Sequence, residues 1–63
     1  MDDVYIIFDS RNKVTNVVAD MELLQHLFNE LGVYPDSGIG QTTKFHIAGG
    51  EYAGRVERWA VTS

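Results

Sequence analysis

The sequence contains no cysteine, a single proline and only five basic residues among its 63 positions. The absence of cysteine excludes disulfides and thiolate metal sites, two common ways of stabilising a small domain. A chain of this length buries only about 60% of the surface that its unfolded form exposes, so its core is thin. We therefore expect one domain over residues 1–63, with self-association or a bound partner as the leading source of extra stability.

Long apolar runs are also missing, and the start of the chain carries acids where a secretion signal needs basic residues. Neither a membrane span nor export is indicated, and the expected location is the cytoplasm. Two basic and seven acidic residues precede position 42, whereas three basic and two acidic residues follow it. Because an acidic front repels nucleic acids and anionic membranes, neither is favoured as a general partner.

The clearest element in the sequence is an amphipathic helix over residues 21–31. Asp20 is a suitable N-cap, because its side chain can accept a hydrogen bond from a free backbone N–H of the first turn. Gly32 can adopt the left-handed conformation that ends a helix. The apolar stripe repeats with a period of 3.6 residues and comprises Leu23, Leu24, Leu27, Phe28 and Leu31.

Runs of β-branched and aromatic residues on both sides of this helix predict four strands. Residues 4–18 form a hairpin around a polar turn, and residues 42–49 and 55–63 form the third and fourth strands. The hairpin register stays open. A two- or four-residue loop places Ile6 beside Val17, whereas a three-residue loop places Phe8 beside Val14 and Val4 beside Val18.

The expected fold is therefore an α+β miniprotein of order ββαββ, with a four-stranded sheet and one helix packed on one face. In element order and size, the chain resembles the β-grasp arrangement of small immunoglobulin-binding domains. That resemblance implies that the first and last strands lie parallel in the middle of the sheet, with residues 13–18 and 42–48 at the edges. A simple antiparallel sheet is the alternative.

The stretch SGIGQTTK at residues 37–44 has the composition of a phosphate-binding loop. Such a loop needs a helix directly after it, whereas the residues after Thr43 alternate like a strand. We therefore expect a turn. His26 and His46 are too few for a closed zinc site, and no nucleophile has a base at a readable spacing. No metal, no cofactor and no enzymatic activity are expected.

One helix leaves the second face of the sheet free to bind a partner. We expect Phe45, Ile47, Trp59 and Val61 to face the helix. Lys44, His46, Arg58 and Ala60 then face outward, together with either Tyr5 and Ile7 or the alternate residues of the first strand. Two tyrosines in glycine-containing loops add recognition side chains. The candidate partner-binding residues are Tyr5, Ile7, Tyr34, Lys44, His46, Tyr52 and Arg58.

These features favour a small protein-binding module, a regulator or inhibitor that acts by direct protein–protein contact. Proteins of this size class include phage-encoded blockers of host enzymes and defence systems. Pairing through the edge of residues 42–48 is an equal route to a protein partner. One alternative is single-stranded nucleic-acid binding, with Tyr5, His46 and Arg58 as a stacking platform. The other is a homo-oligomeric, self-assembling structural subunit.

Overall fold

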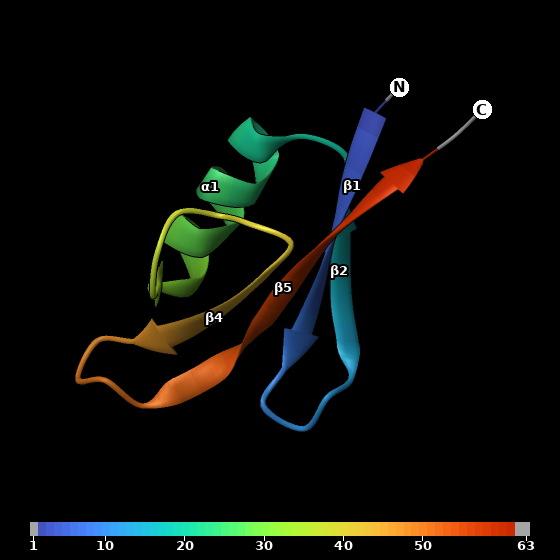
Figure 1. Ribbon diagram of the computed structural model, residues 1–63. Coiled ribbons are helices and arrows are strands. Elements are labelled where there is room, and N and C mark those ends of the chain that lie inside the picture. Colours follow the sequence, from blue (N-terminus) through green and yellow to red (C-terminus); the bar gives the residue numbers. More distant parts are fainter. Residues whose placement is uncertain (1, 62–63) are drawn as a thin grey trace.

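The computed structural model describes residues 2–61, which form one helix and five strands (Figure 1). The fold is α+β, as predicted, and the last two residues of the expected final strand lie outside the described range. The elements in chain order are β1 (Asp2–Asp9), β2 (Val14–Val18), α1 (Met21–Leu31), β3 (Val33–Pro35), β4 (Thr42–Ile47) and β5 (Tyr52–Val61).

The five strands form one antiparallel sheet in the order β2-β1-β5-β4-β3. The first and last strands are central, as in the β-grasp order, but they run antiparallel, so the parallel pair implied by the resemblance is wrong. Strand β1 pairs with β5 from Asp2 opposite Val61 to Asp9 opposite Gly54. Helix α1 lies against one face of this strongly twisted sheet (Figure 1).

The prediction of four strands was wrong, because Val33–Pro35 forms a fifth strand, β3. This strand has only three residues, Val33–Pro35, and follows the helix directly. Proline has no backbone N–H to donate and is therefore tolerated in an edge strand. Strand β3 pairs with β4 through Val33 opposite Ile47, so β4 is an interior strand and not the free edge that we expected.

Helix α1 has the predicted bounds and caps. The Asp20 side chain accepts a hydrogen bond from the backbone N–H of Leu23 at 2.8 Å. Gly32 has a φ of 68°, and its N–H bonds to the carbonyl groups of Phe28 and Asn29. No helix within residues 2–61 is long and apolar enough to span a bilayer.

The β1–β2 hairpin follows the three-residue-loop register near the turn and the other register beyond it, so that Val18 lies opposite Tyr5 and not opposite Val4. Near the turn, Asp9 donates to the Lys13 carbonyl at 2.9 Å around a three-residue loop, and Phe8 lies opposite Val14. A β-bulge then shifts the pairing by one residue, so that Ile6 lies opposite Val17. An extra residue in one strand absorbs the shift without turning the apolar side chains to the wrong face.

The core lies between α1 and the sheet face that the helix covers. Within it, the rings of Phe28 and Phe45 pack with their centroids 5.1 Å apart at an angle of 48°. Its seven buried apolar residues are Tyr5, Ile7, Leu24, Phe28, Val33, Phe45 and Val56.

Candidate interaction surface

The sheet face turned away from α1 carries a second set of apolar and aromatic side chains. Residues opposite each other in an antiparallel pair share a face, so alternation and register identify this set. On β5, Val56 is buried, and Trp59 therefore lies on the other face, opposite Val4 of β1. We call this face the open face; its residues are Val4, Ile6, Phe8, Val14, Val17, Tyr34, Thr42, Lys44, His46, Tyr52, Arg55, Glu57 and Trp59.

An ordered polar network lies at the centre of the open face. The Arg55 Nε donates to Glu57 Oε2 at 2.9 Å, and the Trp59 indole N–H donates to Glu57 Oε1 at 3.1 Å. The Arg55 guanidinium also lies 3.9 Å from the centre of the Phe8 ring and donates to the side chain of Asn12. Because Glu57 is held between two donors, the indole of Trp59 has a defined position at the surface.

This network also affects the ionisation of its carboxylate. The hydrogen bond from Arg55, followed by the one from Trp59, lowers the pKa of Glu57 below its ordinary value of 4.5. Both donors stabilise the charged form, so Glu57 remains ionised and the network intact throughout the neutral range.

Three aromatic side chains gather at the β3–β4 end of the open face. His46 pairs across strands with Tyr34 on β3 and with Tyr52 on β5. The rings of His46 and Tyr52 meet edge to face with their centroids 6.1 Å apart. The His46 Nδ1 contacts the Asp36 carboxylate, which ties the loop after β3 to β4. The structure thus brings together three of the predicted residues, Tyr34, His46 and Tyr52.

Two other predicted residues, Tyr5 and Ile7, lie in the core. Their side chains are only 7% and 1% exposed, so the expectation that they face outward is wrong. The sequence VYIIF is apolar at every position, and its own pattern cannot select which alternate set faces the helix. The outward residues of β1 are Val4, Ile6 and Phe8.

The predicted orientation of β5 was also wrong, because the other alternate set of its side chains faces the helix. Trp59 was expected to face the helix but is 56% exposed on the open face. Arg58, expected on the same outward face as Lys44, instead pairs across strands with buried Tyr5, and its Nε lies 3.8 Å from the Asp3 carboxylate. The residue opposite Lys44 is Arg55.

The sequence did contain a signal for the correct assignment of β5. An inward Trp59 would also turn Arg55 and Glu57 toward the helix and bury two charged groups in a thin core. Val56 between these two charges is the apolar position that favours burial. Applying this cost to the whole strand would have identified Arg55, Glu57 and Trp59 as surface residues.

The glycine-containing stretch at residues 37–44 leads into strand β4, as predicted, and no helix follows it. The Gly40 N–H donates to Thr43 Oγ1 at 3.1 Å, and the Asp36 N–H donates to the Lys44 carbonyl at 3.0 Å. The backbone donors at these two positions are therefore directed to the protein itself. Neither Gly38 nor Gly40 has a positive φ, so the turn does not depend on glycine at these positions.

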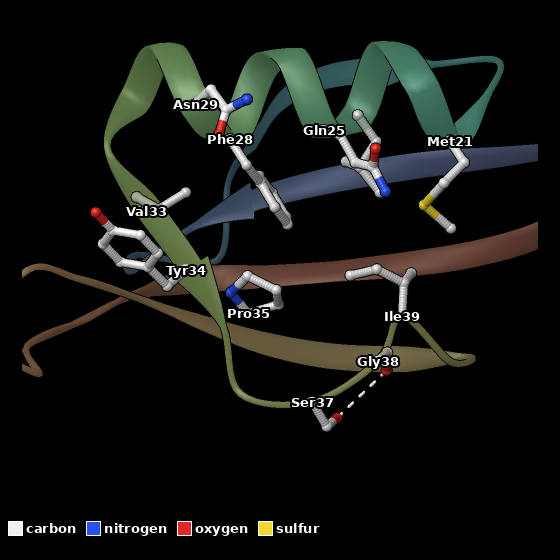
Figure 2. A pocket seen from close by; sticks show the side chains of 11 residues that line it. Met21, Gln25, Phe28, Asn29, Val33, Tyr34, Pro35, Ser37, Gly38 and Ile39 are labelled. Atoms are coloured by element: carbon white, nitrogen blue, oxygen red, sulfur yellow. Dashed lines mark hydrogen bonds between the residues drawn. The ribbon is translucent and has the colours of Figure 1, made fainter.

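A groove with a volume of about 470 Å³ separates α1 from the segment after β3 (Figure 2). Figure 2 shows Phe28 directed from the helix toward this space, with Pro35 and Ile39 opposite. None of the residues that line it is Asp, Glu, His, Lys or Arg, so none of them supplies a carboxylate, an imidazole or a positive charge. Its eleven lining residues are Met21, Leu24, Gln25, Phe28, Asn29, Val33, Tyr34, Pro35, Ser37, Gly38 and Ile39.

Residues 2–61 contain no cluster of three histidine or carboxylate side chains that could hold a metal ion. The candidate site is the open face itself, with the exposed ring of Trp59, the Arg55–Glu57 ion pair and adjacent apolar side chains. Comparisons of the chain with protein-family models, with curated proteins and with solved structures gave no match.

Proposed function

We propose that this protein is a protein-binding module that acts as a small regulator or inhibitor by direct contact through the open face. The observation that carries the proposal is a sheet with a helix on one side and exposed Trp59, Val14 and Val17 on the other. Contiguous apolar side chains that lack a covering layer mark sites of association in small soluble proteins.

The central network supports this role because it holds an aromatic anchor in place. Tryptophan and arginine are enriched among the residues that dominate binding energy, and a fixed ring loses little entropy on association. The indole N–H of Trp59 is satisfied by Glu57, so contact with a partner costs no unpaired donor. A hollow of about 170 Å³ beside this ring is lined by Gln41, Thr42, Glu57, Arg58 and Trp59.

A single-stranded nucleic acid is the second candidate, because Lys44 and Arg55 lie opposite each other on a face that also carries aromatic rings. Two features favour a protein instead. Arg55 is already bonded to Glu57, and the chain as a whole has a net charge of −4.

Affinity capture from the lysate of the native host, with and without nuclease, tests the proposal. The tagged chain is compared with the variant Trp59→Ala and with Leu23→Ala, which truncates a similarly exposed side chain on α1. A partner protein whose capture is unaffected by nuclease should bind the parent chain and Leu23→Ala equally. Trp59→Ala should bind it about 30-fold more weakly, because loss of a central aromatic anchor costs about 2 kcal/mol.

One control and two contrary outcomes make the result of the experiment clear. Amide NMR spectra should show that both variants keep the parent fold, since both altered side chains are exposed. Equal capture by Trp59→Ala would contradict the open face as the binding site. Capture that disappears with nuclease, and falls steeply with salt, would instead favour the nucleic-acid function.

A further inference from the structure

The two edges of the sheet differ in how well they are protected against pairing. The β3 edge has three residues and contains Pro35, which cannot donate a backbone hydrogen bond. The β2 edge has five residues, VTNVV, with neither proline nor charge. No strand among residues 2–61 pairs with the outer side of β2. Its unpaired backbone groups are therefore open to another strand.

The side chains of β2 make this edge attractive to an apolar partner strand. Val14 and Val17 are 56% and 61% exposed, and both lie on the open face. The bulge between these two valines keeps both on the same side of the sheet. A second strand that added to this edge would find two aligned methyl-bearing side chains beside its backbone hydrogen bonds.

The charged residues on either side of β2 indicate which strand could pair with this edge. Arg11 and Lys13 precede the strand, whereas Asp20 and Glu22 follow it. All four are exposed, and none takes part in an ion pair with another residue of the described range. An antiparallel copy of the same segment would place basic residues beside acidic ones at both ends of the pairing. A parallel copy would place like charges together.

We propose that β2 pairs antiparallel with β2 of a second copy of this chain, forming a symmetric dimer with a continuous ten-stranded sheet. In the register that keeps the open faces aligned, Val14 lies opposite Val17 of the second copy. Arg11 then lies opposite Asp20 of the second copy. The interface is isologous, so each contact occurs twice and the assembly closes as a dimer.

The dimer uses the edge of β2, whose Val14 and Val17 also belong to the open face proposed to bind a partner. The mass of the purified chain tests the dimer with no other partner present, so the two proposals can succeed or fail separately. A dimer would also add stability to a monomer with a thin core, because the second copy buries edge backbone and valine side chains that one copy leaves in water.

Analytical ultracentrifugation of the purified chain over a range of concentrations is the first test. The expected mass is twice 7.1 kDa at high concentration and 7.1 kDa on dilution. Val17→Lys should weaken the dimer by at least about tenfold, because it replaces the contact with Val14 of the second copy by a charged group in each chain. Val61→Lys is the matched control, since it alters an exposed valine at the far end of β5 and should leave the dimer intact.

Charge reversal tests the orientation of the two strands. Arg11→Glu should weaken the dimer, because it places a carboxylate opposite Asp20 of the second copy; in a parallel pairing the same change would only replace one like-charge pair by another. In an equal mixture of isotope-labelled and unlabelled chains, intermolecular nuclear Overhauser effects should connect the methyl groups of Val14 and Val17.

Three results would overturn the proposal. The first is a mass of one chain at every concentration. The second is a dimer that persists in Val17→Lys. The third is a dimer lost in Trp59→Ala, which would place the contact on the open face and not at the edge.

Discussion

At the scale of single residues, Gly54 has the most restricted position among the glycines. It lies in β5 opposite Asp9 of β1 and Phe45 of β4, with a φ of +153°. A Cβ atom at this position would lie 2.0 Å from the Phe8 carbonyl oxygen and 2.8 Å from the Phe45 ring. The close approach of the central strands therefore depends on a residue without a side chain.

Gly54→Ala should lower the free energy of unfolding by about 3 kcal/mol, because the backbone of β1 must move to admit the methyl group. Gly38→Ala is the matched control: no atom lies within 4 Å of its Cβ position, and its φ is ordinary. That variant should stay within about 0.5 kcal/mol of the parent. Urea denaturation followed by circular dichroism measures both, and equal stability of the two variants would contradict the model of strand packing.

At the scale of secondary-structure elements, the β1–β2 turn is organised by one carboxylate. The Asp9 Oδ1 accepts hydrogen bonds from the backbone N–H groups of Arg11 at 2.8 Å and Lys13 at 3.0 Å. The bond from Lys13 is the main cause of a pKa for Asp9 below its ordinary value of 3.8. Burial opposes this shift but does not cancel it.

The lowered pKa gives the turn a defined dependence on pH. The folded state holds Asp9 as a carboxylate, so its stabilising contribution is present above pH 3.8 and is lost as the pH falls through the lower folded value. Asp9→Asn keeps the shape but cannot ionise. Its stability should therefore fall less than that of the parent between pH 5 and pH 2, in urea denaturation at each pH. An identical acid response of the two chains would show that Asp9 does not contribute.

The elements also differ in how far local sequence determines them. Helix α1 was predicted to the residue because its stripe, N-cap and C-terminal glycine all act within a few positions. Strand β3 was missed because three residues carry no usable periodicity, and its pairing with β4 is what makes Val33–Pro35 a strand. The hairpin register was ambiguous because turn length favoured one pairing near Phe8 and another near Ile6, and the bulge satisfies both.

At the scale of the whole molecule, charge is divided between the two sides. Residues 14–43 hold four acids and no lysine or arginine. The open face instead carries Lys44 and Arg55 with Glu57, and Asp36 contacts His46 at its β3–β4 end. If the open face binds a protein, as proposed, its partner would meet a surface that does not share the acidic character of the chain, which favours a partner patch with acidic groups around an apolar centre.

The small core implies that one large truncation unfolds the protein. A single core in a chain of this size supplies no more than about 3–5 kcal/mol, and removing a buried leucine side chain costs about 2–5 kcal/mol. Leu24 is fully buried, whereas its neighbour Leu23 is 51% exposed. Leu24→Ala should therefore be largely unfolded at 25 °C, and Leu23→Ala should remain folded. Circular dichroism and amide NMR spectra distinguish these results, and a folded Leu24→Ala variant would contradict the assigned core.

The amino-acid sequence by itself determined the α+β class, the helix over residues 21–31 and the polar turn of the first hairpin. Each depends on hydrogen bonds and side-chain periodicity within a few residues. The tertiary structure alone decided that β1 and β5 run antiparallel, that β3 completes the sheet, and that Tyr5 and Ile7 are buried. These features depend on which strands pair, and a strand with apolar residues at every position acquires an inner and an outer face only when its neighbours and the helix select one.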